Sequence, residues 1–317
     1  MKPILCNYYI TYRCNSRCLF CDIWKRPQRS DLADCSLNHV YQNLRQLRSA
    51  GVKFVDFTGG EPLLHSRLPD MLMFARSLGM ITSVTTNCLL YPSRAAELSG
   101  KIDLLHFSLD ALDESEYQGI RGVAGLKKVL QSLDLAEKLG KKADLLFTVT
   151  NENYRAIDKL IRLAAERKLI LIVNPLFNCS SQQRLSLSAL NYVEQFRSER
   201  YVYINRALHR LIRAGGNDIE HPRCRSVDSA VVISPDNKLL LPCFHHQRAA
   251  IPINDSLEQI LKLPVVNSFR KKQGRFPSCQ GCTINCYFDP SFLYTVDEFF
   301  WLSLISKIKY ARDKYLP

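Results

Sequence analysis

The feature that most restricts the fold of this chain is a regular alternation of short β-type runs with longer segments of helical period. Six such runs occur before about residue 175, and they cover Ile4–Ile10, Phe54–Phe57, Ile81–Thr85, Leu104–Ser108, Leu145–Val149 and Leu169–Val173. Strands that alternate with helices predict βα units and a parallel sheet, which makes the fold class α/β. Right-handed crossovers would curl these units into a partial (β/α)6 TIM-like barrel rather than a closed eight-unit barrel.

The segment between the first two predicted strands illustrates the helical period. Leu37, Leu44 and Leu47 lie on one face of a predicted helix, which follows Ser36 as a candidate N-cap. Gly51 stands where the chain must leave the helix, and glycine is the usual residue at such a C-terminal stop. The sequence therefore predicts a helix that packs its apolar face on the sheet.

The last third of the chain has a different pattern. A helical stretch with apolar residues from Val193 to Leu211 ends at Gly215, and a hairpin follows, with strands at Val231–Ile233 and Leu239–Leu241 around a turn at 235–237. We therefore predict three parts. These are a barrel with trailing helices over residues 1–216, a small cysteine-rich domain over 217–290 and an amphipathic helix over 291–317.

Neither a membrane span nor a secretory signal is evident. Asn174 and Pro175 interrupt the most apolar run, and Arg13 follows Met1 too closely for the apolar region of a signal peptide. We therefore expect a cytoplasmic protein. In that reducing compartment, the chain's 12 cysteines, most of which fall in two groups, favour metal binding over disulfides.

The first cysteine group follows the first predicted strand. Cys14, Cys18 and Cys21 form the pattern C-x3-C-x2-C on one short loop. Three thiolates so spaced can hold three corners of a [4Fe-4S] cube and leave the fourth iron open to a ligand. A structural zinc site would need a fourth protein ligand and more often uses two separated pairs. The triplet therefore favours an iron-sulfur cluster with an open iron.

Several further motifs accompany this triplet at the ends of predicted strands, and together they resemble the radical SAM superfamily. Phe20 precedes the last cysteine, Thr58–Pro62 resembles the family's GGE motif, and Ile120–Gly122 resembles a stretch whose arginine meets the cofactor carboxylate. The cofactor-binding positions that the resemblance implies are Phe20, Gly59, Gly60, Glu61, Asn87, Ser108, Asp110 and Arg121. All lie where barrel-like α/β enzymes assemble their sites.

The resemblance also implies a chemistry. The methionine part of S-adenosylmethionine would chelate the open iron, and one electron from the cube would cleave the cofactor to a 5'-deoxyadenosyl radical, which abstracts hydrogen from a C-H bond of the substrate. An electron donor such as flavodoxin or ferredoxin is implied as a partner. The substrate stays open among a peptide, a sugar-like metabolite, and a lipid, isoprenoid or tetrapyrrole intermediate.

The second cysteine group comprises Cys224, Cys243, Cys279, Cys282 and Cys286. A hairpin bounded by cysteines and followed by C-x2-C resembles the SPASM and twitch domains, which carry auxiliary clusters. Five cysteines are too few for two clusters, so the resemblance implies one auxiliary [4Fe-4S] cluster on the first four. Cys286 is then a spare thiol, an alternative ligand or a catalytic group. Structural zinc is the competing interpretation of this group.

Two other cysteines are weak catalytic candidates, because Cys88 and Cys179 follow the third and sixth predicted strands. For both, simple packing in the core is the favoured interpretation.

The net charge of +13 permits an alternative function, the modification of RNA. The chain contains no recognisable RNA-binding module, so a nucleic acid partner is not expected. A second alternative is a zinc-bearing interaction module without catalytic activity. The triplet together with the GGE motif argues against that alternative.

The final predicted helix, over 292–315, combines an aromatic surplus with a basic end. We expect it to pack on the barrel. The alternative is peripheral contact with a membrane, in which Lys307, Lys309, Arg312 and Lys314 would meet anionic headgroups.

Overall fold

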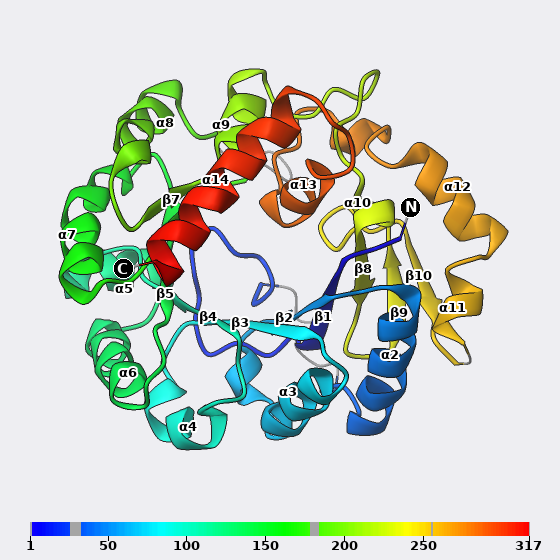
Figure 1. Cartoon of the computed structure of the whole chain (residues 1–317), viewed down its shortest axis with the longest axis horizontal. Helices are drawn as coiled ribbons and strands as arrows, with labels where there is room; N and C mark the ends of the chain where they lie inside the picture. The colour runs from blue at the N-terminus through cyan, green and yellow to red at the C-terminus, as the bar shows by residue number, and fades with distance from the viewer. Residues whose placement is uncertain (1, 26–32, 178–183, 255, 317) are drawn as a thin grey trace.

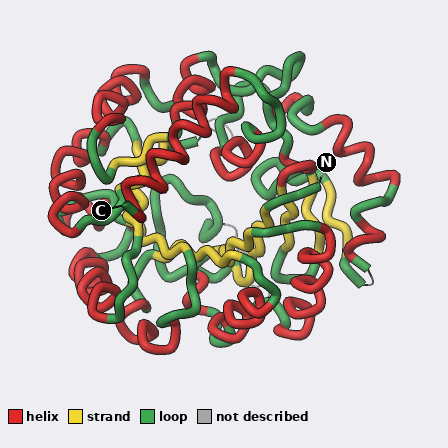
Figure 2. Tube along the Cα trace, viewed as in Figure 1, coloured by secondary structure: helices red, strands yellow, loops and turns green. Residues whose placement is uncertain are grey.

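The computed structural model describes residues 2–25, 33–177, 184–254 and 256–316. Within these residues the strands form one 10-stranded sheet, in which the first seven are parallel neighbours in chain order. They are β1 (Leu5–Thr11), β2 (Phe54–Gly59), β3 (Ile81–Thr86), β4 (Leu104–Ser108), β5 (Asp144–Val149), β6 (Leu171–Pro175) and β7 (Val202–Ile204). The sheet curls round an interior, with most helices on its outer side (Figures 1 and 2). The predicted α/β partial barrel and its six strands are confirmed.

Helices cover the outer face of the sheet. They are α2 (Leu37–Ala50), α3 (Leu68–Ser77), α4 (Tyr91–Leu98), α5 (Glu114–Arg121), α6 (Leu126–Lys138), α7 (Ile157–Arg167) and α8 (Leu187–Glu194). A further helix, α9 (Arg206–Arg213), packs instead on a second core cluster that includes Tyr9 and Val232. Short 3-10 helices are η1 (Pro62–Leu64), η2 (Tyr154–Ala156), η3 (Gln195–Ser198) and η4 (Pro277–Cys279). In α2, Leu44 and Leu47 are fully buried, and Gly51 ends the helix with a φ of 100°. Ser36 occupies the predicted N-cap position without a capping hydrogen bond from its side chain.

Alternation along the strands separates the outer core from the interior of the barrel. In β2, Val55 and Phe57 are fully buried within the main hydrophobic core, whereas Asp56 and Thr58 between and after them are only half-buried. Successive side chains of a strand point to opposite faces of the sheet. Asp56 and Thr58 therefore face the barrel interior, away from the helices.

The C-terminal part continues the same sheet. Its strands are β8 (Ala230–Ile233), β9 (Lys238–Leu241) and β10 (Ala249–Pro252), and its helices are α10 (Ser226–Ser229), α11 (Leu257–Ile260), α12 (Pro264–Lys272) and α13 (Asn285–Ser291). β8 pairs parallel with β1 and antiparallel with β9. The predicted hairpin is thus confirmed, and Asn237 in its turn has a φ of 58°.

The continuous helical stretch predicted before Gly215 is wrong. A short strand, β7, interrupts it and pairs with β6. Asn205 then caps α9, because its side chain accepts hydrogen bonds from the backbone N–H groups of Ala207 and Leu208. The sequence did contain a signal for this strand, because the apolar run Val202–Ile204 stands directly before Asn205, a strong N-cap residue.

The final helix also begins later than predicted. Asp297 caps α14 (Glu298–Tyr315), and its carboxylate accepts from the N–H groups of Phe299 and Phe300. α14 packs on α9 and β7, as expected. Near its end, Tyr310 and Lys314 donate at 2.5 and 2.6 Å to Asp144, the buried first residue of β5. In the described part of the chain, no helix is long and apolar enough to cross a membrane.

Candidate active site

The loop that carries the first three cysteines follows β1 and is seen through the ring of strands in Figure 1. Backbone hydrogen bonds tie this loop to the end of α5, because Arg17 N donates to Arg121 O and Leu19 N to Ile120 O, both at 3.0 Å. Gly122 lets these segments approach, since a Cβ there would lie 2.5 Å from Arg17 O. The predicted Ile120–Gly122 motif therefore lies directly beside the cysteine loop.

The two glycines after β2 hold the other side of the loop. A Cβ on Gly59 would lie 1.9 Å from Thr11 O, and one on Gly60 would lie 2.1 Å from Arg13 O. Both contacts are far inside van der Waals distance and involve backbone, so only glycine fits without displacing the loop. Hydrogen bonds from Gly60 N to Thr11 O and from Glu61 N to Arg13 O, at 2.9 and 2.8 Å, close this contact.

Glu61 is buried at the centre of these contacts. Its carboxylate accepts hydrogen bonds from Thr86 Oγ1 at 2.9 Å, Asn87 N at 2.8 Å and Leu63 N at 3.0 Å. Burial raises the pKa of Glu61, and these hydrogen bonds oppose that rise. A carboxylate has about four acceptor positions. It therefore retains capacity for one further donor, such as an amino group.

Asn87 connects the end of β3 to the cysteine loop. Its Nδ2 donates to Asn15 Oδ1 at 2.7 Å and to Ser16 Oγ at 2.9 Å. The predicted residues Glu61 and Asn87 thus lie together, and both brace the loop.

A buried ion pair lies on the opposite side of the loop. Arg121 Nε is 2.5 Å from Asp110 Oδ2, and Asp110 Oδ1 also accepts from Thr148 N at 2.8 Å. Arg121 Nη1 lies 3.7 Å from Cys18 Sγ, and its guanidinium carbon is 5.3 Å from the centre of the Phe20 ring. Four of the predicted residues therefore meet here. Ser108, also predicted, is buried at the end of β4.

The three loop thiols lie close enough to influence one another. Burial raises the pKa of Cys14 to about 12 and that of Cys21 to about 11, and neighbouring cysteines add to both rises. Among the residues that the structure describes, no three His, Cys, Asp or Glu side chains are arranged around a single metal ion. The separate corners of a cube need a wider arrangement than one ion does. The loop thus fits a cluster, whose binding would displace the thiol protons.

The auxiliary cysteines converge on one enclosed cavity. Cys224, Cys243, Cys279 and Cys282 all line it, whereas Cys286 does not. Burial raises the pKa of Cys282, and Coulombic repulsion from the other three thiols raises it further. The four thiols around this cavity offer a ligand set for a metal cluster, whose binding would displace their protons. His246, next but two to Cys243 in the chain, also lines the cavity.

Cys286 lies instead at the barrel interior. Part of its surface is open to solvent, but the protein around the thiol removes most of its hydration and raises its pKa to about 12. The Asp56 carboxylate adds to this rise. The adjacent Asn285 donates from Nδ2 to Asn174 Oδ1 of β6 at 3.1 Å. α13 thus contacts β6 through Asn285, and the Cys286 thiol lies near enough to Asp56 to feel its charge.

The interior also contains polar residues that sequence reasoning missed. Burial raises the pKa of Asp56 to about 6, opposed by a hydrogen bond from Ser83. His106 lies with its Nδ1 3.4 Å from Thr85 Oγ1, and burial lowers its pKa to about 4. A charged residue within an otherwise apolar strand, as in Phe54–Gly59, was the available signal.

Cys88 and Cys179 are the other two candidate catalytic thiols. Cys88 is fully buried in the main core, and its Sγ lies 3.7 Å from Thr86 O. This is the packing position favoured for it. Cys179 lies outside the described residues.

Comparison with known proteins identifies the family of this chain. Residues 8–164 match the sequence profile of the radical SAM superfamily. The chain belongs to this superfamily. Its cofactors are accordingly a [4Fe-4S] cluster and S-adenosylmethionine, and the loop of Cys14, Cys18 and Cys21 fits the cluster in number and spacing.

Relatives agree with this assignment. A protein of Methanocella arvoryzae named "Probable GTP 3',8-cyclase" is 24% identical over 258 residues, which cover 79% of this chain and 82% of that protein. The Fe-coproporphyrin III synthase of Methanosarcina barkeri is 28% identical over 175 residues, 53% of this chain and 42% of that protein. In four other GTP 3',8-cyclases, the match spans only 44% to 51% of the relative's length.

Solved structures share the fold. Streptococcus suis SuiB, bound to the precursor peptide SuiA, superposes with a TM-score of 0.68 at 19% identity and covers 89% of this chain and 70% of its own. The structure of anSMEcpe with bound AdoMet gives a TM-score of 0.66 at 17% identity, over 98% of this chain and 97% of its own. The whole radical SAM chain, including its C-terminal part, therefore has a known architecture.

Proposed function

We propose that this radical SAM protein cleaves S-adenosylmethionine reductively and abstracts a hydrogen atom from an unactivated C-H bond of its substrate. When bound, the cluster and S-adenosylmethionine supply a 5'-deoxyadenosyl radical. The observation that carries the proposal is the convergence of Gly60, Glu61, Asn87 and Arg121 on the loop of three thiols. These residues hold the loop rigid, and they are the proposed cofactor contacts together with Phe20, Gly59, Ser108 and Asp110.

The experiment is an anaerobic reaction of cluster-reconstituted protein with S-adenosylmethionine, a reductant and candidate substrates, followed by mass spectrometry. Formation of 5'-deoxyadenosine together with a changed substrate is expected. Intact cofactor under conditions where both clusters are reduced would refute the proposal. An altered RNA as the main product would support the alternative function.

The barrel interior favours a polar substrate. Asp56, Ser83, His106 and Asn174 face it and offer acidic and neutral hydrogen-bonding groups. Peptides, sugar-like metabolites and nucleotides present matching donors, and the names of the sequence relatives include both a nucleotide cyclase and a porphyrin enzyme. We therefore favour a polar substrate over a plain lipid or isoprenoid. We also propose a flavodoxin or ferredoxin as the electron donor and the cytoplasm as the location of the protein.

Asp56→Asn is expected to weaken substrate turnover at least about tenfold, because a hydrogen bond to a charged group contributes about 1.5–3 kcal/mol. Substrate-independent cofactor cleavage should persist. In the wild type, Asp56 ionises as the pH rises through about 6, so substrate affinity should increase from pH 5 to pH 7. The variant should lack that increase, as measured by kcat/KM across this range. Equal pH profiles for the two proteins would exclude Asp56 from substrate binding.

We also propose that residues 217–290 bind one auxiliary [4Fe-4S] cluster through Cys224, Cys243, Cys279 and Cys282. Reconstituted protein should then contain about eight irons per chain, and Cys282→Ala should reduce this to about four. Cys286→Ser is the matched control and should retain all of the iron, because Cys286 lies outside the four-cysteine cavity. About four irons with one tightly bound zinc in the wild type would support the zinc interpretation instead.

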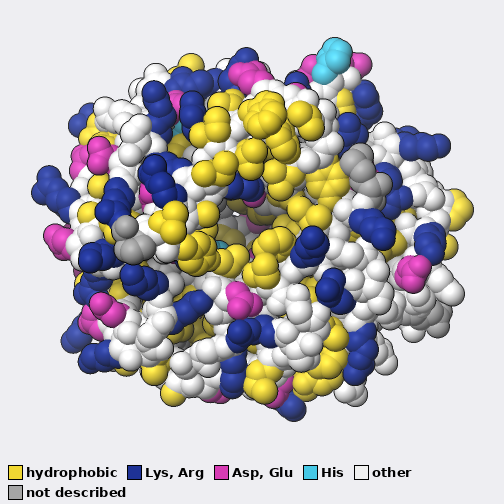
Figure 3. All heavy atoms as spheres, viewed as in Figure 1, with side chains coloured by type: hydrophobic (Ala, Val, Ile, Leu, Met, Phe, Trp, Pro, Cys, Tyr) yellow, Lys and Arg dark blue, Asp and Glu magenta, His cyan; other side chains and the backbone are white. Residues whose placement is uncertain are grey.

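Peripheral membrane contact through α14 is a separate proposal. Lys307, Lys309 and Lys314 form ion pairs with Asp289, Asp313 and Asp144, which weakens their attraction to headgroups, and Arg312 is the one of the four predicted basic residues that stays largely exposed. An apolar stripe nevertheless remains on α14, where Trp301 and Ile308 are 55% and 59% exposed, and hydrophobic side chains gather over this helix in Figure 3.

This stripe predicts weak binding to neutral vesicles with little salt dependence. Trp301→Ser should reduce co-sedimentation with phosphatidylcholine liposomes severalfold, while Met73→Ser on α3, 54% exposed in the wild type, should not. Absence of wild-type protein from the liposome pellet would rule out membrane contact through α14.

A further inference from the structure

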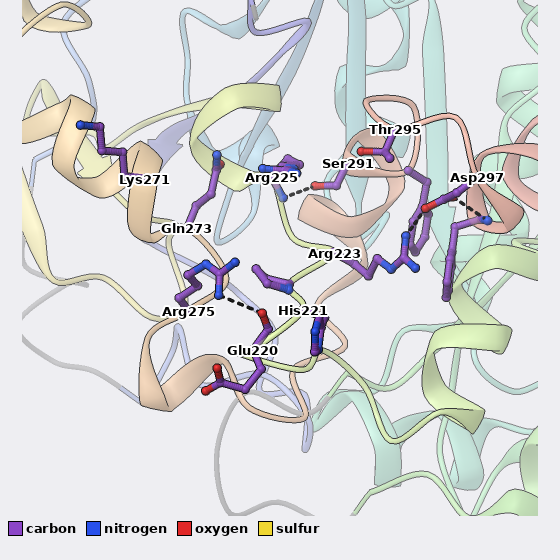
Figure 4. A pocket seen from close by; sticks show the side chains of 13 residues that line it. Glu220, His221, Arg223, Arg225, Lys271, Gln273, Arg275, Ser291, Thr295 and Asp297 are labelled. Atoms are coloured by element: carbon purple, nitrogen blue, oxygen red, sulfur yellow. Dashed lines mark hydrogen bonds and ion pairs between the residues drawn. The ribbon is translucent and has the colours of Figure 1, made fainter.

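A second concave site lies in the C-terminal part of the chain, apart from the loop of three thiols. Its cavity of about 380 Å³ is lined by three segments, 220–225, 271–275 and 291–299 (Figure 4). Pockets for small molecules commonly occupy about 300–1,000 Å³. The cavity is therefore large enough for a compact ligand.

The lining of this cavity is predominantly cationic. Arg223, Arg225, Lys271 and Arg275 line it, against two carboxylates, those of Glu220 and Asp297. His221 contributes a further nitrogen-bearing side chain, which lies 3.1 Å from Asp218. The cavity thus carries an excess of about two positive charges at neutral pH.

Two of the four cations are already held in place by the protein. Arg223 forms an ion pair with Asp297 and stacks on Phe299, with its guanidinium carbon 4.6 Å from the ring centre. Arg275 Nη1 donates to Ile219 O at 3.2 Å and to Glu220 O at 2.9 Å. These contacts fix the direction of each guanidinium group while leaving other N–H groups available.

The other two cations have no acidic partner among the residues that the structure describes. Within the described part of the chain, neither Arg225 nor Lys271 forms an ion pair. Figure 4 shows Arg225 near Ser291, whose Oγ accepts from the Arg225 backbone N–H at 2.8 Å. Arg225 and Lys271 lie on different segments that line the same open pocket, with Lys271 at its edge in Figure 4.

We propose that this cavity binds a small molecule that carries a phosphate group. A phosphate monoester bears about −1.5 to −2 charge at neutral pH, which matches the excess charge of the lining. Guanidinium groups bind its oxygens in pairs, and a lysine adds a point charge. The concave shape suits a small ligand better than a protein surface. The proposal does not depend on the reaction proposed for the barrel.

This cavity lies beside the four-cysteine cavity of the proposed auxiliary cluster. Arg223 and Arg225, which line it, flank Cys224 in the chain, and Cys224 lines the four-cysteine cavity. The two cavities thus share one chain segment. A phosphate bound at Arg225 would lie close to the proposed auxiliary cluster.

The test is isothermal titration calorimetry of the reconstituted full chain with inorganic pyrophosphate in phosphate-free buffer at low ionic strength. Saturable binding at one site is expected, and Arg225→Gln and Lys271→Gln should each weaken it at least tenfold. Lys271→Arg should restore most of the affinity, which shows that charge and not fold is responsible. Arg67→Gln, an exposed change on the N-terminal side of α3, should leave binding unchanged.

Three titration results would overturn the assignment. They are the absence of saturable pyrophosphate binding, equal affinity in the Arg225→Gln and Lys271→Gln variants, and equal or tighter binding of citrate, which would indicate a site for carboxylates. A salt-sensitive complex with an acidic flavodoxin that is lost in these variants, without pyrophosphate binding, would make the cavity a protein-docking surface and likewise overturn it.

Discussion

Replacement of Cys18 by alanine is expected to abolish 5'-deoxyadenosine formation while the protein remains soluble and folded. Cys18 is buried, and its Sγ lies 3.7 Å from Arg121 Nη1, so its thiolate would be both shielded and close to a positive charge. Loss of one of three ligands removes the cluster rather than the core. The same outcome is expected for Cys14→Ala and Cys21→Ala, measured by chromatography of the nucleoside product.

Cys35→Ala is the matched control for this experiment. Cys35 is as buried as Cys18, but it lies in the main hydrophobic core, where its Sγ is 3.6 Å from His65 Nε2. Cofactor cleavage should survive this change at close to the wild-type rate. Undiminished product from any of the three loop variants would contradict the assignment of the cluster to this loop.

The strands of the barrel were predictable because each is a short apolar run bounded by turn residues or helices. Leu104–Ser108 was found with its observed limits, and the others shifted by one or two residues at their ends. β7 escaped because Val202–Ile204 is only three residues long and its apolar positions also fit a helical period. What identifies it as a strand is its pairing with β6, a contact that no local pattern contains.

The cofactor site was more predictable than the interior of the barrel. Its residues form compact motifs at strand ends, so topology alone brings Glu61, Asn87 and Arg121 to one loop. Asp56 and Cys286, in contrast, lie far apart in the chain, and the docking of α13 brings the Cys286 thiol near enough to feel the Asp56 charge. Neither residue belongs to a motif, and their proximity depends on how the C-terminal part docks.

The second large effect is expected at the buried ion pair. Arg121→Met should lower the free energy of unfolding by about 3–5 kcal/mol, because the Asp110 carboxylate would remain buried without its partner. Burial already raises the pKa of Asp110, and Arg121 opposes that rise, so removal of the arginine leaves the desolvation uncompensated. Denaturant unfolding of the cluster-free protein measures this loss.

The double variant Asp110→Leu with Arg121→Met separates stability from cofactor binding. Replacing both members of a buried pair by apolar residues of similar size is often neutral for stability, so the double variant should regain most of the lost free energy. It should still cleave S-adenosylmethionine poorly, because Arg121 also contacts Cys18 and Phe20 beside the cluster loop. A double variant that is stable and fully active would show that the pair serves the fold alone. An Arg121→Met protein as stable as the wild type would instead show that Asp110 accepts a proton when its partner is lost, at little cost to the fold.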